Sequence, residues 1–462
     1  MEADTHTPAM NLGSTFKLVP LLVLLALPVQ AARPPFDLFN DPELDTLVRR
    51  AVEHNQDLAA AAARVSQARA LGGAARAEFY PQLALDAFAG RQRSLESGYR
   101  ASDYASLPGF LSWEIDLWGR LRKSNAAARS EARAVEALYA SARLSLAAEV
   151  AETFYSLRAA QWEHGTLLRT LDARRRGHRI VADRAEIGTS SPLDLARAET
   201  ELAAAEAALA EAKRAVAQLT HALDVLVARD PEERVIEAAR TVETPASLPS
   251  APPVPANLNA TVLLNRPDVA AAQLSMDAAS ARIGVARTAF FPAISLTGSA
   301  GWESTELSGF VSADHRVWSF GPRLYLPLFQ GGRLRANLAR AQAVFVETSA
   351  NYRQTLLLAM REVRDALAVS RYLDEQISAT QRMSAAARRA AELSHARYDA
   401  GSVSYLEVVE SERSALDAER ALHRLRGQRL VAAASLIRAL GGSLDPDAPG
   451  ARDPQAAGQG RL

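Results

Sequence analysis

Apolar positions follow two different periods along the chain, and the two periods alternate in a fixed order. Long segments place apolar residues every three or four positions, as in Leu144, Val150, Phe154 and Leu157, which is the spacing of a helix face. Short segments alternate apolar and polar residues, which is the spacing of a β-strand with two unlike faces. The pattern predicts a mainly α-helical protein with a few strands.

The helical segments are unusually long. Residues 121–185 contain no proline and only two glycines, and about 65 helical residues would span roughly 97 Å. A turn at 188–192 precedes a returning helix to about residue 228, and the same order recurs as a helix over 334–400, a turn at 401–404 and a helix to 440. Such lengths indicate antiparallel coiled coils. Earlier helices are predicted over 41–77, interrupted near His54 and Asn55, and over 259–288.

Four segments have the alternation of strands, two before each long helix. Alternation is clear over 83–89, 112–117, 294–297 and 318–328, with one apolar face and one face carrying Glu114, Asp116 and Arg323. This pattern fits either ordinary half-buried hairpins or strands with lipid on one side and water on the other. Four strands cannot close a barrel, and an open edge in lipid leaves backbone groups unpaired. Membrane insertion would therefore need twelve strands from three chains.

The chain is a tandem repeat. Asp57 recurs as Asp268 and Pro81 as Pro292, and further along Gly188 recurs as Gly401. A Pro-rich stretch between the copies is typical of an extended connection. We divide the chain into a signal peptide (1–31), a first repeat (32–244), a Pro-rich linker (245–257), a second repeat (258–442) and a disordered C-terminal tail (443–462).

Composition narrows the classes of function. Lys17, the apolar run 18–27 and the small-x-small sequence 29–31 predict a secretory signal. No other apolar run is long enough for a transmembrane helix, so a membrane span would have to be a closed barrel. The absence of cysteine excludes thiolate sites and lipid attachment through an N-terminal cysteine. Zero net charge gives no reason to expect nucleic acid as a partner, and no cofactor loop, metal motif or nucleophile–base pattern indicates an enzyme.

Several segments together resemble one family, the TolC-type outer-membrane efflux channels and in particular the branch that works with RND pumps. The resemblance covers about residues 36–442 and is carried by 266–269 (RPDV), 281–287, 290–298, 327–333 and 436–442. It implies a homotrimer with a twelve-stranded β-barrel in the outer membrane and an α-helical barrel in the periplasm. It also implies a periplasmic adaptor (membrane fusion) protein and an inner-membrane RND pump as partners, and a passive exit path for drugs or other small molecules.

The resemblance also implies roles for individual residues. The periplasmic gate would contain Glu407, Glu410, Asp194 and Tyr398, although the family has aspartates at the first two positions. The turns that receive the adaptor would contain Arg184, Ile187, Gly188, Thr189, Arg397, Gly401 and Ser402. Apart from the resemblance, the residue type of Trp113 and Trp318 fits either aromatic anchors at the membrane interface or simple packing within the barrel.

Each of these residues also has a local explanation. Carboxylates near helix starts complement the helix dipole, and glycines after helices end them in the left-handed conformation. Two other functions remain open at this point: an exit duct for type I protein secretion, and a soluble periplasmic coiled-coil scaffold.

Overall fold

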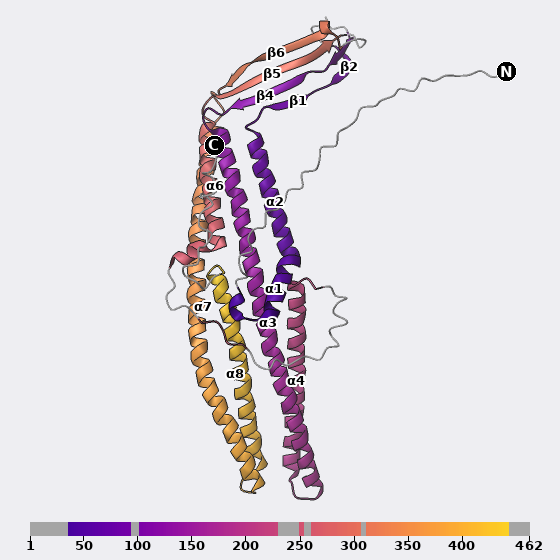
Figure 1. The fold of residues 1–462 in the computed structure, drawn as a ribbon, viewed down its shortest axis with the longest axis vertical. Coiled ribbons are helices and arrows are strands. Elements are labelled where there is room, and N and C mark those ends of the chain that lie inside the picture. The colour runs from indigo at the N-terminus through magenta and orange to yellow at the C-terminus, as the bar shows by residue number, and fades with distance from the viewer. Residues whose placement is uncertain (1–35, 94–100, 230–248, 254–259, 306–310, 443–462) are drawn as a thin grey trace, which may run out of the picture. The chain divides into compact units, whose positions relative to one another are not determined.

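The computed structural model describes residues 36–93, 101–229, 249–253, 260–305 and 311–442 (Figure 1). Its helices in the first half are α1 (Pro42–His54), α2 (Gln56–Ala77), α3 (Arg120–Glu186) and α4 (Pro192–Leu226). Those in the second half are α6 (Pro267–Thr288), α7 (Arg333–Asp399) and α8 (Tyr405–Ala439). Short 3-10 turns cover Asp37–Phe39, Ala260–Asn265 and Ala313–His315.

The two halves have helices of equal length. The helices α3 and α7 have 67 residues each, and α4 and α8 have 35 each. At 1.5 Å per residue these correspond to about 100 Å and about 50 Å. The predicted long helices and their turns are therefore confirmed to within a few residues.

One helix prediction was wrong in its first part. Residues 260–265 form a 3-10 turn, and α6 begins only at Pro267; Asn259 lies outside the described residues. The reason is local: Arg266 precedes a proline and is extended (ψ 131°), because the proline ring disfavours a helical conformation at the preceding residue. The interruption predicted near Asn55 is present, with Asn55 extended and its side chain accepting a hydrogen bond from the Leu58 backbone N–H.

The strands form one antiparallel sheet. They are β1 (Gln82–Leu85), β2 (Phe88–Arg93), β3 (Ala101–Ser106), β4 (Gly109–Ile115), β5 (Ala293–Ser304) and β6 (Arg316–Tyr325). The strand β4 pairs with β1 and β5, β5 pairs with β6, and β2 pairs with β3. The four predicted passages are present, but the first (83–89) is divided at Asp86–Ala87 into β1 and β2. The second (112–117) falls at β4, and β3, which precedes β4 across Leu107–Pro108, was not predicted. Pro108 has no N–H to donate, and the Asp86 N–H donates to its carbonyl (3.0 Å).

The register separates an apolar from a polar face, as predicted. Trp113 lies opposite Leu296, and Leu296 opposite Pro322, whereas Glu114 lies opposite Ser295 and Ser295 opposite Arg323. The alternation predicted to Leu117 and Leu328 ends earlier, because β4 stops at Ile115 and β6 at Tyr325. Large apolar side chains on the apolar face remain exposed: Leu83 is 81% exposed, Phe320 63% and Trp318 79%.

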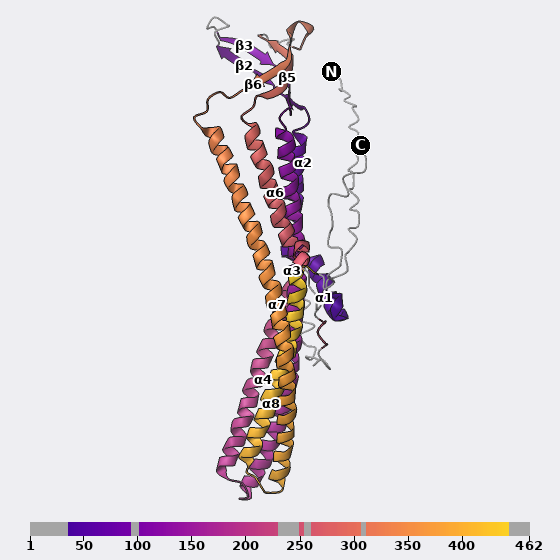
Figure 2. The same cartoon turned by 90° about the vertical axis from the view of Figure 1, so that its left-hand side faces the viewer.

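The helices pack in two levels around α3 and α7. The helix α3 packs along α2, α4, α6 and α8, and α7 packs along α6 and α8 (Figures 1 and 2). None of the helices in the described part of the chain is both long and apolar enough to cross a membrane.

Shorter helices meet end to end where the two levels join. The Asn55 side-chain N–H donates to the carbonyl of Leu226 at the end of α4 (3.1 Å), and Arg266 donates to the carbonyl of Ala439 at the end of α8 (2.9 Å). Asn55 and Arg266 hold equivalent places, one residue before α2 and α6, in the two copies of the repeat. We call these contacts the Asn55 junction and the Arg266 junction. The main apolar core lies beside them and includes Phe36, Val150, Phe154, Tyr155, Leu223 and Ile437.

Candidate gate at the helical turns

The turns between α3 and α4 and between α7 and α8 are built in the same way. Gly188 (φ 74°) and Gly401 (φ 70°) adopt the left-handed conformation that ends many helices. One residue later, Thr189 donates through both its backbone N–H and its hydroxyl to the Arg184 carbonyl (2.8 and 2.9 Å). Ser402 does the same to the Arg397 carbonyl (2.9 and 2.9 Å). Thr189 and Ser402 therefore close the two turns. The sequence analysis placed both residues at the turns but did not predict these hydrogen bonds.

The carboxylates that begin α4 and α8 are used differently. Asp194 forms a reciprocal cap with Ser191: its N–H donates to the Ser191 hydroxyl (3.1 Å), and its carboxylate accepts from that hydroxyl (2.8 Å). Its repeat counterpart Glu407 has a longer side chain and accepts from the Arg397 guanidinium instead (3.2 Å). Glu407 is thus tied to its own hairpin, α7 and α8.

Glu410 lies one turn further along α8. Its side chain is exposed, and it forms no ion pair with any residue that the structure describes. The two candidate gate carboxylates therefore face water in a single chain, and Glu407 is half exposed (46%).

Tyr398 contacts the other hairpin through Arg184. The Arg184 guanidinium donates to the Tyr398 hydroxyl (3.1 Å) and lies 5.6 Å from the ring centroid, close enough for a cation–π contact. Within one chain this pair links α3 to α7, and Asp194 takes no part in it. The gate roles expected for Asp194 and Tyr398 stay predictions.

Apolar side chains project from the first turn. Ile187 is 75% exposed and Leu193 58% exposed. Exposed apolar groups at a turn that is held rigid by hydrogen bonds suit a protein contact. The structure therefore brings together the residues of each turn that were predicted to dock the adaptor, and it places the exposed Leu193 beside those of the first turn; docking itself stays a prediction.

The predicted aromatic anchors lie on the apolar face of the sheet. The Trp113 indole N–H donates to the Phe79 carbonyl (2.9 Å), where α2 leads into β1. Trp318 makes no such contact and is largely exposed. Sequence reasoning missed Trp118, whose indole N–H donates to the Pro292 carbonyl (2.8 Å) and whose ring stacks on Phe291. Its position beside Gly119, which precedes the long helix, was the available signal.

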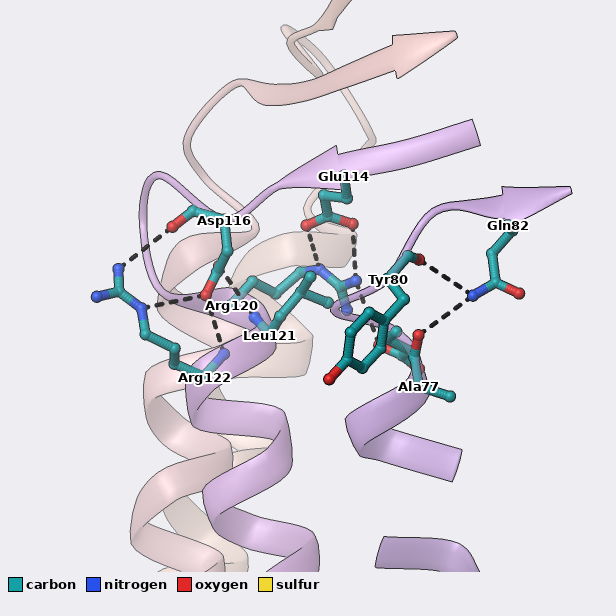
Figure 3. A network of polar contacts seen from close by, with 9 residues as sticks. Ala77, Tyr80, Gln82, Glu114, Asp116, Arg120, Leu121 and Arg122 are labelled. Atoms are coloured by element: carbon teal, nitrogen blue, oxygen red, sulfur yellow. Dashed lines mark hydrogen bonds and ion pairs between the residues drawn. The ribbon is translucent and has the colours of Figure 1, made fainter. Parts of the chain in front are cut away.

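Charged side chains fix the passage from the sheet into α3, which sequence reasoning also missed (Figure 3). Arg120 donates two hydrogen bonds to Glu114 (both 2.7 Å) and lies 3.6 Å from Glu78. Asp116 accepts from the backbone N–H groups of Leu121 and Arg122 (both 3.0 Å), which satisfies free donors at the helix start. Glu114 lies in β4 and Asp116 directly follows its last residue, so the sheet and the helix are held together at one point.

Within the described ranges, no group of three or more His, Asp or Glu side chains is arranged to hold a metal ion. A sheet with one exposed apolar face that leads into two 67-residue helices is an architecture that suits a membrane-associated protein.

Comparison with known proteins places the chain within that class. The chain belongs to the outer membrane efflux protein family, whose model matches residues 47–229 and 258–442. It is similar to outer membrane protein OprJ of Pseudomonas aeruginosa, with 35% identity over 411 residues, which cover 88% of this chain and 85% of OprJ. It is also similar to the cation efflux system protein CusC of Escherichia coli O157:H7, with 33% identity over 409 residues and 87% of each chain covered. The open-state structure of the MtrE outer membrane channel of Neisseria gonorrhoeae superposes with a TM-score of 0.77 and 33% identity, covering 88% of this chain and 90% of MtrE.

Proposed function

We propose that this protein is the outer-membrane exit duct of a tripartite efflux pump and that it works as a homotrimer. Family membership supports an efflux channel rather than an enzyme. The observation that carries the proposal is the sheet, which exposes a continuous apolar face. Its edge strands have no partner on their outer sides among the residues that the structure describes. Such a sheet is unstable in water alone but suits a lipid surface.

The edges of the sheet favour three copies. Among the described residues, β1 pairs only with β4 and β6 pairs only with β5. An unpaired edge costs several kcal/mol per group in lipid, so each edge needs a strand from another subunit. Four strand passages from each of three subunits give twelve, an even number that closes a barrel. The polar face, with Glu114 and Arg323, would then line the water-filled interior.

The helices would continue this duct into the periplasm, and the turns would form its inner end. Three copies of Glu407 and Glu410 place six carboxylates around the axis. Like charges raise one another's cost of ionisation and attract counter-ions, so this ring favours cations. The exposed Ile187, Leu193 and the rigid turns beside them are the contact surface for a periplasmic adaptor, which connects the duct to an inner-membrane RND pump. Opening would be a shift between two states that the adaptor binds unequally.

The cargo in this proposal is a drug or another small molecule. The relatives include proteins named for cation efflux, such as CusC, and for solvent efflux, such as SrpC of Pseudomonas putida. The duct binds no cofactor in this mechanism, and the pump supplies the energy. In this proposal the protein lies in the outer membrane.

Single-channel recording in planar bilayers tests the proposal. We expect the purified protein to conduct with a preference for cations, and the variant Glu407→Gln with Glu410→Gln to lose most of that preference in a KCl gradient. A matched control removes two exposed carboxylates elsewhere on the helices, Glu131→Gln with Glu206→Gln, and should leave the reversal potential unchanged. Equal reversal potentials in all three proteins would exclude the carboxylate ring, and a protein that never conducts would exclude the duct.

A further inference from the structure

A chain of alternating charges, buried at its centre, joins α3, α4, α7 and α8 near the turns. Arg174 of α3 bonds to Glu412 of α8 and lies 3.6 Å from Glu201 of α4. Glu201 accepts from Arg413 of α8 (2.6 Å), and Glu412 also contacts His395 of α7. We call these five residues the Arg174 network. It connects the α3/α4 hairpin to the α7/α8 hairpin within one subunit.

The centre of the network is shielded from water. The side chains of Arg174 and Glu201 are each 9% exposed, and Glu412 is 28% exposed, whereas Arg413 and His395 are more than half exposed. A buried guanidinium must stay paired, because an uncompensated charge is costly away from water. Moving the hairpins apart would remove Glu412 from Arg174. Separation of the hairpins is therefore opposed at this level.

Apolar layers lie on both sides of the network. Leu167, Leu171 and Leu209 form a buried cluster between α3 and α4, and Val181 and Val408 are buried nearer the turns. Apolar layers alone allow neighbouring helices to slide by one turn at little cost. A polar layer in such a seam fixes the register, because a shift leaves its charges without partners. The Arg174 network is such a layer near the turns, and the Arg420–Glu163 pair (2.6 Å) joins α8 to α3 further from them.

The network lies next to the candidate gate, further from the turn along α8. Glu412 follows Glu410 by two residues and Glu407 by five, about 3 Å and 7.5 Å along α8. Glu407 is bonded to Arg397 of its own hairpin, so it moves with α7 and α8. The contact that ties this part of α8 to the other hairpin is the one to Arg174 and Glu201. The more distal link, Arg184 to Tyr398, is exposed and is weakened by water.

We propose that Arg174 is a positioning residue of the gate: it holds the α7/α8 hairpin in register with α3/α4 and so keeps Glu407 and Glu410 at the constriction. The inference rests on the proposed function, because it assumes that the turns form the closed end of the duct. Opening then requires Arg174 to give up Glu412, with Glu201 keeping the guanidinium paired while Glu412 retains His395. Arg174 itself contacts no transported molecule.

The test compares two buried arginines of equal exposure. Arg174→Met removes the buried link between the hairpins and leaves the more exposed Arg413–Glu201 bond, whereas Arg429→Met removes a 2.8 Å bond to Asp374 within the α7/α8 hairpin; the Arg174 and Arg429 side chains are each 9% exposed. In planar bilayers we expect Arg174→Met to raise the fraction of time spent conducting by about tenfold, the effect of one lost charge-assisted hydrogen bond. Arg429→Met should stay within about twofold of the wild type.

Two further variants separate position from simple damage. Glu412→Gln removes the same link from α8 and should also raise the conducting fraction. Arg174→Lys should give a smaller rise, because lysine keeps the positive charge; some rise remains, because an ammonium cannot hold two carboxylates in a planar fork. Heat stability of the trimer on gels should fall similarly for Arg174→Met and Arg429→Met. Equal conductance of these two variants would overturn the inference. A wild type that does not conduct would instead refute the proposed function.

Discussion

Replacing Arg266 with methionine is expected to destabilise the protein at the Arg266 junction. Arg266 is 7% exposed and donates two hydrogen bonds to Asp268 (3.0 and 2.8 Å), one to Glu362 (2.7 Å) and one to the Ala439 carbonyl (2.9 Å). It therefore joins α6, α7 and the end of α8 at once. Methionine fills much of the same volume but makes none of these bonds.

The expected loss of unfolding free energy depends on how far water can replace the hydrogen bonds that Arg266 makes. A hydrogen bond to a charged group contributes about 1.5–3 kcal/mol, but Asp268 and Glu362 are 32% and 40% exposed and would be partly rehydrated. The Ala439 carbonyl would lose its buried donor, at about 1–3 kcal/mol. Together we expect the free energy of unfolding to fall by about 2–4 kcal/mol, which corresponds to a drop of roughly 3–8 °C in the unfolding midpoint.

Circular dichroism at 222 nm during heating of the purified protein measures this midpoint. Arg282→Met is the matched control, because Arg282 lies on the same helix and pairs with Glu131, but both side chains are about half exposed. An exposed pair contributes about 0–1 kcal/mol, so this control should shift the midpoint by less than about 2 °C. If the two variants lowered the midpoint equally, the junction would not be held by Arg266.

Three more expectations follow from the same structure. Burial raises the pKa of the Asp268 carboxyl, but the hydrogen bonds and charge of Arg266 outweigh this effect and leave the pKa below its ordinary value. The stability that the ionised Asp268 contributes is therefore present above the unfolded pKa of about 3.9 and is lost as the pH falls through the folded pKa. Heating Asp268→Asn and wild type side by side should accordingly show a lower midpoint for the variant at pH 7 and a shrinking difference below about pH 4. Gly72→Ala in α2 should raise the free energy of unfolding by about 0.5–1 kcal/mol, and with it the midpoint, whereas Gly188→Ala should lower both by a similar amount. Both sites have open space for a methyl group, but only Gly188 has a positive φ (74°). Gly427→Ala should lower the midpoint despite its better helix propensity, since the added carbon would lie 2.5 Å from the Ala159 methyl, and a rise would show that α3 and α8 separate easily.

The local rules of the chain predicted the elements well. Proline and glycine mark the helix ends, so α3, α4, α7 and α8 begin and end within a few residues of the predicted positions. The same rule, applied fully, would also have found the break at Arg266, because Pro267 was visible in the sequence. The breaks between β1 and β2 and between β3 and β4 depend on Asp86 and Pro108 facing each other, and only the paired register reveals that contact.

The links between distant parts of the chain were not predictable in this way. Arg174 and Glu412 are far apart in the sequence, and nothing in the local pattern of either helix selects one partner among the many charged residues. Tyr398 shows the same difficulty, since its partner within one subunit is Arg184. The positions of the turns could be read from glycines and hydroxyl residues, but the contacts across hairpins depend on the rotation of each helix about its axis.

The end-to-end junctions have a consequence for how such a chain can change over evolution. At the Asn55 and Arg266 junctions, α4 is joined to α2 and α8 to α6 by side-chain bonds and not by peptide bonds. Extra residues placed in the connection after Leu226 therefore need not disturb the line of either helix pair. A single residue inserted within α3 or α7 would instead turn every later side chain of that helix by about 100°. Length variation among descendants of this chain should accordingly gather at the level of the junctions, while the two 67-residue helices keep their length.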